Sequence, residues 1–355
     1  MPPLHELSDL GWSDARTESF SDHAQRGLSP ARVVAEHRGQ VDLLTPEGTV
    51  RSLVRPTLLG DVDAPGVGDW VAARISDDPH MPSMVEAVLP RTTAFVRKHA
   101  GRSSAPQLIA ANIDTVLIVT SLNADLNARR IERYLVAARS GGAEAVVVLN
   151  KADLVDDADA IRALVPHEHV VAVSALEGDG LEGLAPWVGP GRTVALVGMS
   201  GVGKSTLVNA LLGRNAQDTG GIREHDDRGK HTTTSRSLLP LPGGGCLIDT
   251  PGMRELGLTG GDDVLDEVYD DIAGLAAACR FHDCGHDQEP GCAIVAAIEA
   301  GDLEPGRLTS YHKLQRELAG EVRRRSRQAD REHGRRWGKM IRDAQRLRRD
   351  RTGKD

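Results

Sequence analysis

Nine consecutive residues, Gly198–Thr206, have the types and spacing that bind phosphate groups. They read Gly-Met-Ser-Gly-Val-Gly-Lys-Ser-Thr and match the pattern G-x-x-x-x-G-K-[ST] throughout. Glycines let main-chain N–H groups approach phosphate oxygens, Lys204 reaches the β- and γ-phosphates, and the Ser205 hydroxyl is a ligand for Mg²⁺. A buried strand, Thr193–Val197, precedes the loop, and a helix, Ser205–Leu212, follows it. The context predicts a phosphate loop made of Gly198, Met199, Ser200, Gly201, Val202, Gly203, Lys204, Ser205 and Thr206.

The tetrapeptide at positions 150–153, Asn-Lys-Ala-Asp, has the side chains that select guanine. The Asp153 carboxylate can accept hydrogen bonds from guanine N1–H and the exocyclic amine, and adenine would leave it unpaired. Lys151 can lay its aliphatic stem on the base. Ser174 and Ala175 end a later strand and match the loop whose main-chain N–H meets guanine O6. We therefore expect the base to be bound by Asn150, Lys151, Ala152, Asp153, Ser174 and Ala175.

A second motif on the phosphate side, Asp-Thr-Pro-Gly at 249–252, ends the apolar strand Cys246–Ile248. An aspartate at this point holds Mg²⁺ through a water molecule, and the N–H of Gly252 can reach the γ-phosphate. Alone, this tetrapeptide is equally typical of a simple turn. Its position after a phosphate loop favours the interpretation that Asp249 and Gly252 face the metal and the terminal phosphate.

The segment Gly229–Thr234, which reads Gly-Lys-His-Thr-Thr-Thr, lies between these two motifs, where a first switch loop is expected. We expect Thr233 to complete the Mg²⁺ shell when a triphosphate is bound. Met253 follows Gly252, whereas many GTPases place a glutamine near there to orient the attacking water. A methionine side chain cannot orient water, so His231 becomes the candidate. The alternative is that His231 is a solvated loop residue.

Four further residues have the spacing C-x(4)-C-x-H-x(5)-C and could bind a metal. Three thiolates and one imidazole within a short segment suit a closed tetrahedral site for structural zinc. His282 is an alternative ligand to His286, and unliganded buried cysteines are the alternative to a metal site. Cys246 lies within a strand and is interpreted as a core residue. The expected zinc ligands are Cys279, Cys284, His286 and Cys292.

Two kinds of strand pattern must position these residues. Five short strands separated by turn residues precede residue 90, which suits a small OB-type β-barrel, although the pattern fits any small β domain. Continuous apolar strands alternate with helices from Asn112 onward, as in a doubly wound parallel sheet with ligand groups at the carboxyl strand ends. Residues 1–28 are polar, show little periodicity and are interpreted as a loose arm. The five barrel strands are Ala31–Glu36, Val41–Leu44, Val50–Val54, Trp70–Ile75 and Met84–Leu89.

Charge and composition limit the possible partners and locations. The longest apolar runs, such as Thr115–Leu122, are too short to span a bilayer, and the N-terminus has no signal pattern, so we expect a cytoplasmic protein. Residues 321–355 hold 14 Lys and Arg against 6 Asp and Glu, while the whole chain has a net charge of −8. The basic residues of Arg323–Arg349 lie on all sides of an expected helix. They indicate either phosphate contacts with RNA or a solvated helix.

Ordinary GTPases place the phosphate loop before the guanine motif, and here the order is reversed. With this order, the combined motifs resemble the ribosome small-subunit-dependent GTPase A family (RsgA/YjeQ), which are circularly permuted GTPases, over nearly the whole chain. The resemblance implies a multidomain α/β P-loop protein with an N-terminal OB fold, a circularly permuted G domain and a C-terminal zinc-binding helical domain. The expected boundaries are 1–28 for the arm, 29–98 for the OB fold, 99–261 for the G domain, 262–320 for the zinc domain and 321–355 for a basic C-terminal helix.

The resemblance also implies an activity and partners. It implies a GTPase stimulated by the 30S ribosomal subunit that assists late 30S maturation, acts as a monomer, contacts 16S rRNA and binds no membrane. The implied cofactors are one structural Zn²⁺ per chain and Mg²⁺ with GTP, with Ser205 and Thr233 as magnesium ligands. Lys204 and His231 are the implied catalytic residues.

Two other functions fit parts of the sequence. The chain could be an RNA-binding scaffold whose nucleotide site turns over negligibly, which the missing glutamine favours and intact Lys204, Ser205 and Asp249 oppose. It could instead be a GTPase that regulates a metabolic or tRNA-modifying partner. GTP hydrolysis with and without 30S subunits distinguishes the scaffold from a 30S-dependent GTPase. Co-sedimentation with 30S subunits distinguishes a GTPase with another partner from a 30S-dependent one.

Overall fold

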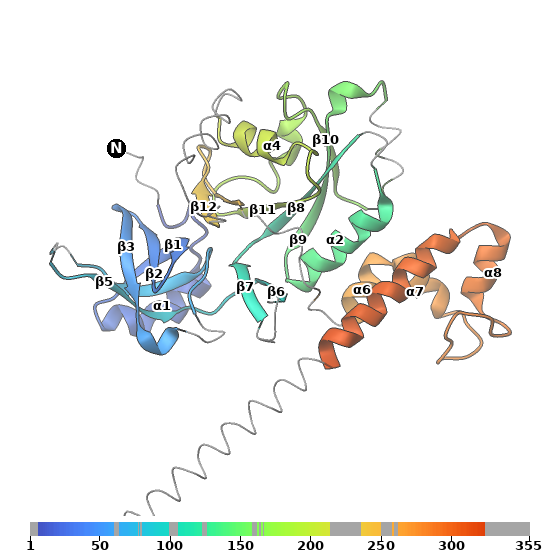
Figure 1. Cartoon of the computed structure of the whole chain (residues 1–355), viewed down its shortest axis with the longest axis horizontal. Helices are drawn as coiled ribbons and strands as arrows, with labels where there is room; N and C mark the ends of the chain where they lie inside the picture. The colour runs from blue at the N-terminus through green and yellow to red at the C-terminus, as the bar shows by residue number, and fades with distance from the viewer. Residues whose placement is uncertain are drawn as a thin grey trace, which may run out of the picture. The chain divides into compact units, whose positions relative to one another are not determined.

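The computed structural model describes residues 6–59, 64–76, 78, 80–98, 106–122, 126–157, 162, 165, 167–213, 236–249, 258 and 262–323. The chain divides into two compact units. The first consists of Met1–His99 and Ala105–Gly257, and the second of Ala100–Ser104 and Leu258–Asp355. In Figure 1 the first unit runs from blue to yellow and the second is orange to red.

The first five strands of the first unit close into a barrel. They are β1 (Ser29–His37), β2 (Gln40–Thr45), β3 (Gly48–Val54), β4 (Trp70–Arg74) and β5 (Ser83–Val88). Their order is β1-β2-β3-β5-β4, and β4 pairs back with β1. The β3–β5 pair is parallel and the others are antiparallel. This closed order confirms the predicted OB-type barrel. Its core consists of Ala31, Val33, Val41, Leu43, Val54, Val71, Ala73 and Val85.

The N-terminal segment packs on this barrel, so the expectation of a loose arm is wrong. Helix α1 (Asp14–Gln25) buries only Phe20, and Leu10 before it is fully buried. Trp12 contacts both Phe20 and Trp70 of β4 edge-on, with ring centroids 5.7 and 4.9 Å apart. A helix anchored by so few large side chains shows little periodicity, which explains why the sequence pattern did not reveal it.

Five parallel strands form the second part of this unit. They are β8 (Thr115–Ser121), β9 (Glu144–Asn150), β10 (Val170–Val173), β11 (Thr193–Val197) and β13 (Cys246–Asp249), in the order β10-β9-β8-β11-β13. Nearly every residue of β8, β9 and β11 is buried, as expected for parallel strands covered on both faces. The strand that precedes the phosphate loop, β11, lies between strands that come before and after it in the chain. This topology confirms the predicted permuted order.

In the described part of the chain, two helices and two short 3₁₀ segments accompany these strands. Helix α2 (Ala128–Ser140) begins at Asn127, whose side chain accepts a hydrogen bond from the Arg130 N–H. Helix α4 (Lys204–Leu211) follows the phosphate loop. The 3₁₀ segments are η2 (Ala152–Leu154) and η3 (Leu181–Leu184), and a further one in the barrel region is η1 (Pro56–Leu58).

Three short strands are absent from the sequence-based prediction. Strands β6 (Ala94–Lys98) and β7 (Pro106–Ala111) form an antiparallel pair, and in the chain they come between the barrel strands and β8. Strand β12 (Ser237–Pro240) pairs antiparallel with β13 on one side and with β1 of the barrel on the other. Through β12, the barrel strands and the parallel strands belong to one 11-stranded sheet.

The second unit is helical. It contains α6 (Asp262–Val268), α7 (Asp270–Ala276), α8 (Ala293–Ala300) and a helical stretch over residues 305–323. Tyr269 is fully buried, with the Tyr311 ring edge-on at 5.5 Å and the Arg307 guanidinium 4.8 Å above its centroid. The rest of the predicted basic helix, from residue 324 onward, lies outside the described residues. Among the described helices, none has the length and apolar character needed to span a bilayer.

Candidate functional site

The carboxyl ends of the parallel strands bring the expected nucleotide-binding residues to one edge of the sheet. Asn150 ends β9 and lies beside Val173, the last residue of β10, and Ser121, the last residue of β8. Val197 ends β11 and lies beside Ile118 of β8. Ligand sites in open α/β sheets form at this edge, next to the strand where the order reverses.

Two glycines of the phosphate loop are required by close packing. Gly198 has φ 144°, and a Cβ there would lie 2.1 Å from the Val119 carbonyl oxygen. Gly203 has φ 92°, and a Cβ there would lie 2.2 Å from Asn150 Nδ2. No other residue type fits either position without moving a neighbouring strand or loop. The two glycines thus allow the loop to pack directly against β8 and the end of β9.

The loop surrounds the Lys204 ammonium. Gly203 has a left-handed conformation just before α4, which begins at Lys204. Lys204 Nζ donates a hydrogen bond to the Gly198 carbonyl oxygen at 2.9 Å and another to the Met199 carbonyl oxygen. The first N–H groups of α4 and this ammonium form the positively polarised end that a phosphate requires. The Ser205 side chain is exposed at the same end of the helix.

Asn150 connects three loops of the site. Its Nδ2 donates to the Val202 carbonyl oxygen in the phosphate loop at 2.8 Å. Its Oδ1 accepts from the Ala175 N–H at 3.0 Å. Asn150 is almost fully buried, so each of these bonds satisfies a polar group that water does not reach. The structure therefore assigns Asn150 to joining the loops at 150–153, 174–175 and 198–206.

Asp153 is oriented by a neighbouring hydroxyl. Ser174 Oγ donates a hydrogen bond of 2.6 Å to Asp153 Oδ1. The Ser174 hydroxyl also accepts a 3.3 Å bond from the Glu177 N–H, which fixes its position. Lys151 has a left-handed conformation with φ 66°, so the chain turns sharply between Asn150 and Asp153. The Asp153 side chain is exposed at this edge, as a group that recognises a base must be.

Asp249 lies at the end of β13, opposite Ser237 of β12 in the antiparallel pair. On its other side β13 pairs in parallel with β11, where Ala195 lies beside Ile248, the residue before Asp249. Asp249 is exposed at the same edge as the phosphate loop. The other residues expected on the metal and γ-phosphate side include His231, Thr233 and Gly252, and these three lie outside the described residues.

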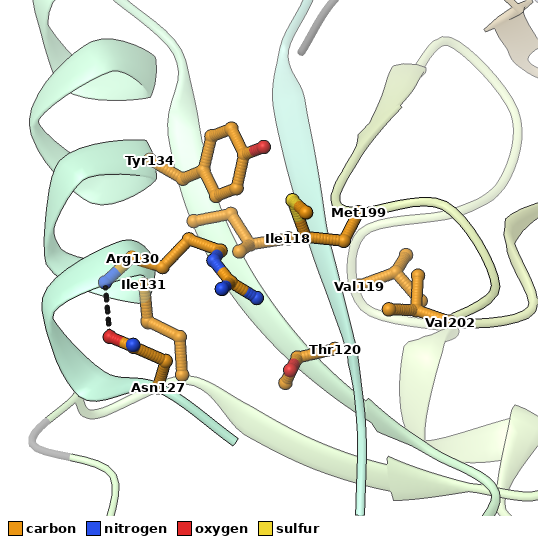
Figure 2. Close-up of a pocket in the computed structure, with 9 residues that line it drawn as sticks. All are labelled: Ile118, Val119, Thr120, Asn127, Arg130, Ile131, Tyr134, Met199 and Val202. Carbon is orange, nitrogen blue, oxygen red and sulfur yellow. Dashed lines mark hydrogen bonds between the residues drawn. The ribbon is translucent and has the colours of Figure 1, made fainter. Parts of the chain in front are cut away.

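A small hollow lies beside the phosphate loop, between β8 and α2 (Figure 2). Arg130 extends from the first turn of α2 into it, and the Met199 side chain of the phosphate loop lies across from it. No sequence motif includes Arg130. The Asn127 cap fixes the start of α2, which places Arg130 in its first turn beside the phosphate loop.

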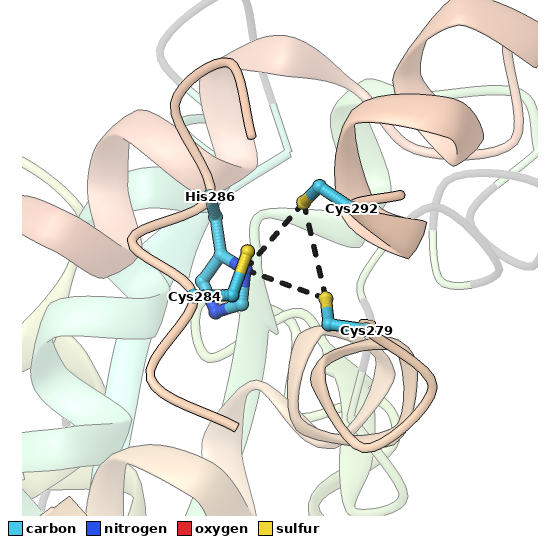
Figure 3. Close-up of side chains that lie close together, drawn as sticks. All are labelled: Cys279, Cys284, His286 and Cys292. Carbon is cyan, nitrogen blue, oxygen red and sulfur yellow. Dashed lines mark hydrogen bonds between the residues drawn. The ribbon is translucent and has the colours of Figure 1, made fainter. Parts of the chain in front are cut away.

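The four residues of the C-x(4)-C-x-H-x(5)-C pattern meet in the second unit. Figure 3 shows the Cys279, Cys284, His286 and Cys292 side chains pointing toward a common centre. Their ligand atoms all lie within 4.8 Å of one another. Cys279 Sγ lies 3.9 Å from Cys292 Sγ, and His286 Nδ1 lies 3.7 and 3.6 Å from those two sulfurs.

These distances fit a tetrahedral metal. Zn–S bonds of about 2.3 Å and Zn–N bonds of about 2.0–2.1 Å imply edges of about 3.8 Å between sulfurs and about 3.6 Å between sulfur and nitrogen. Burial is the largest cause that lowers the pKa of His286, and the nearby His312 lowers it further. A lowered pKa favours the neutral imidazole that a metal binds. The Glu289 carboxylate accepts hydrogen bonds from the N–H groups of Gly285 and Asp287, and so holds the turn around His286. The exposed His282 is not part of the cluster.

Comparison with known proteins identifies relatives over most of the chain. The family profile described as RsgA GTPase matches residues 88–259. A protein of Opitutus terrae named "Small ribosomal subunit biogenesis GTPase RsgA" is 47% identical over 334 residues, which cover 90% of this chain and 91% of that protein. A protein of the same name from Streptomyces coelicolor is 47% identical over 319 residues, or 88% of this chain and 86% of that protein.

Solved structures share the fold. The crystal structure of YjeQ from Thermotoga maritima matches with a TM-score of 0.60 and 28% identity, over 82% of this chain and 99% of that one. YloQ, described as a circularly permuted GTPase, matches with a TM-score of 0.59 and 22% identity, over 83% of this chain and 96% of that one. The motif order, the sheet topology and the length of these similarities agree, and the chain belongs to the RsgA family of circularly permuted GTPases.

Proposed function

We propose that this protein is a GTP hydrolase that binds the 30S ribosomal subunit, assists its late maturation, and hydrolyses GTP faster when bound to it. The observation that carries the proposal is Asn150, which holds the guanine-side loops and the phosphate loop together by two hydrogen bonds. Relatives similar over about nine-tenths of the chain carry the name of a small-subunit biogenesis GTPase, which supports the ribosomal part.

Each residue expected at the site has a proposed role in this reaction, and His231, Thr233 and Gly252 among them lie outside the described residues. Asp153, held by Ser174, accepts hydrogen bonds from guanine, and the main chain of the loop at 174–175 meets guanine O6. Lys204 and the N-terminus of α4 neutralise charge that develops on the β- and γ-phosphates.

Ser205 and Thr233 would hold Mg²⁺ directly, and Asp249 through water. A bound Mg²⁺ would supply charge neutralisation at the phosphate oxygens. His231 orients the attacking water, and Gly252 donates its N–H to the γ-phosphate.

The Cys₃His cluster would hold one structural Zn²⁺ in the helical unit. Its geometry, with three sulfurs and one nitrogen at tetrahedral spacing, supports zinc over Mg²⁺ or Ca²⁺, which prefer oxygen ligands. All four positions are taken by protein atoms, so the role is to stabilise the fold between residues 262 and 320. The remaining proposed segments are 1–28, 29–98 for the barrel, 99–261 for the G domain and 321–355 for the basic tail.

The proposed partners are GTP and GDP, the 30S subunit and its 16S rRNA, with the protein acting as a cytoplasmic monomer. The excess of basic residues in 321–355 supports rRNA phosphate contacts at this end of the chain. Deleting residues 324–355, with the described helix kept through Arg323, should flatten the salt dependence of 30S binding. If both forms have the same slope, the tail makes no phosphate contacts.

The deciding experiment measures GTP hydrolysis at increasing concentrations of purified 30S subunits, with 50S subunits as the control. The proposal requires a saturable increase with 30S and none with 50S. A rate that is negligible under every condition would indicate a scaffold with a structural nucleotide. A measurable rate that no subunit changes would indicate a GTPase with a different partner.

A further inference from the structure

Strand β12 connects the barrel directly to the nucleotide site. Ser237, its first residue, lies opposite Asp249 of β13 on one side. On its other side Ser237 lies opposite Ala35 of β1, the one paired position of β1 and β12 among the described residues. Ala35, Ser237 and Asp249 therefore stand in one row across three strands. Ala35 of the barrel is therefore two strand spacings from Asp249, the aspartate proposed to hold Mg²⁺ through water.

Arg236, the residue before Ser237, contacts both β7 and β1. Arg236 Nη1 donates a 2.9 Å hydrogen bond to the Leu108 carbonyl oxygen of β7. The same nitrogen lies 4.0 Å from Glu36 Oε1 on β1. The Arg236 side chain is 13% exposed and the Glu36 side chain 36%, so water reaches this pair from the Glu36 side.

Glu36 in turn continues the contact into the barrel. Its Oε1 accepts a 3.1 Å hydrogen bond from the Val67 N–H. The turn that contains Val67 is held by Asp69, which accepts from the Gly66 N–H and forms two 2.8 Å hydrogen bonds with Arg91. The Val67 carbonyl oxygen accepts from the Ala111 N–H at the end of β7. We name Glu36, Val67, Leu108 and Arg236 the β1–β12 joint.

We propose that Arg236 is a positioning residue that couples the barrel to the nucleotide site through the β1–β12 joint. A shift of Asp249 between nucleotide states moves Ser237, its partner in the ladder. The Ala35–Ser237 pair alone is too small a contact between β1 and β12 to transmit such a shift. Arg236, anchored to both β1 and β7, forces the barrel strand to follow. The same joint works in reverse, because a coupling free energy between two sites is reciprocal.

Hydrogen exchange on the full-length protein without ribosomes tests the coupling. Amide exchange in β1 is compared with GDP and with a non-hydrolysable GTP analogue bound. In the wild type we expect exchange in β1 to differ by about tenfold between the two nucleotides. Arg236→Met should abolish this difference. Arg55→Met is the matched control, because Arg55 forms an exposed barrel ion pair with Glu86 at 2.9 Å, and it should retain the difference.

Two further variants guard against a folding defect in Arg236→Met. Glu36→Gln keeps an acceptor for the Val67 N–H but removes the charge, and should reduce the difference in β1 exchange. Arg236→Lys keeps the charge and should partly restore it. An unchanged β1 difference in Arg236→Met, an equal loss in Arg55→Met, or no difference in the wild type would each overturn the coupling.

A second measurement rests on the proposed function. Arg236→Met should lower the ratio of 30S-stimulated to basal turnover by about tenfold. GTP affinity and 30S binding, measured by co-sedimentation with the GTP analogue, should stay near wild type. Combining Glu36→Gln with Arg236→Met should lower the ratio no further than Arg236→Met does. If 30S subunits fail to stimulate the wild type, the proposed function is wrong, while hydrogen exchange still decides the coupling.

Discussion

The side-chain amide of Asn150 donates a 2.8 Å hydrogen bond to the carbonyl oxygen of Val202, which lies 52 residues later in the chain. The Oδ1 of the same side chain accepts a 3.0 Å hydrogen bond from the Ala175 N–H. The loop proposed to recognise the base and the loop proposed to bind phosphate therefore share one buried amide. Nucleotide affinity and local stability should both depend on it.

Asn150→Ala should weaken GTP and GDP equally and destabilise the protein. Removing the amide leaves a buried N–H and a buried carbonyl without their partner, which costs about 1–3 kcal/mol per group. Nucleotide affinity is measured by fluorescence titration, and stability by denaturant unfolding. Asn127→Ala is the control, since it removes only the cap of α2 and should cost about 1 kcal/mol of stability while leaving the affinity intact. Equal nucleotide affinity in wild type and Asn150→Ala would contradict the role of Asn150.

Asp153→Asn should change the base that is bound. The carboxylate accepts from guanine N1–H and the exocyclic amine, and the amide cannot accept both bonds, so GTP binding should weaken by several kcal/mol, or about a hundredfold or more. Xanthosine triphosphate should bind the variant better, because its ring has an acceptor where guanine has its amine. Competition titrations measure both affinities. Similar binding of ATP and GTP by the wild type would exclude base recognition by Asp153.

His231→Ala should separate binding from hydrolysis. GTP affinity should remain close to wild type, while 30S-stimulated turnover falls, because the water that attacks the γ-phosphate loses its orientation. Lys204→Ala provides the comparison, since loss of its ammonium should reduce turnover by orders of magnitude. Single-turnover kinetics with saturating GTP measure the chemical step. Unchanged turnover in His231→Ala would mean that another residue or the ribosome orients the water.

Elemental analysis should find one zinc per chain. Cys284→Ser should lose the metal and loosen the helical unit, because a structural zinc contributes its binding free energy to folding. GTP binding should persist, since the nucleotide site lies in the other unit. Cys246→Ser is the matched control, because Cys246 is a buried strand residue outside the cluster, and it should keep the zinc. Protein purified without chelator that holds no zinc would contradict the site.

Stability should fall as the pH drops below about 6.5, the usual pKa of histidine. Burial lowers the pKa of His167, whose Nε2 donates to the Ala145 carbonyl oxygen while Nδ1 accepts from the Glu168 N–H. A lowered pKa in the folded protein means that the unfolded chain binds the proton more readily. The His167 contribution is therefore present above about pH 6.5 and is lost as the pH falls through the lowered pKa. Thermal unfolding from pH 5 to 8 should show a shallower pH dependence in His167→Gln, and an identical dependence would contradict this assignment.

The sequence by itself determined the chemistry of the site. A phosphate loop, a guanine tetrapeptide and a Cys₃His pattern each act through residues that are close in the chain, so spacing alone predicts what each can bind. The guanine tetrapeptide precedes the phosphate loop, and this order predicted the permutation, while the alternation of apolar strands and helices predicted the parallel sheet. The segment Gly198–Thr206 illustrates this, since its glycine, lysine and serine pattern is read from nine consecutive residues between an apolar strand and a helix.

Tertiary structure decided what depends on contacts between distant segments. Five short strands suit any small β domain, and only the pairing of β4 with β1 makes them a closed barrel. The docking of α1 depends on Trp70, which lies far along the chain from Trp12. The β1–β12 joint brings Glu36 to Arg236, and neither residue belongs to a recognisable motif. Such contacts leave no local pattern, because their free energy comes from burial and pairing that exist only once the chain has folded.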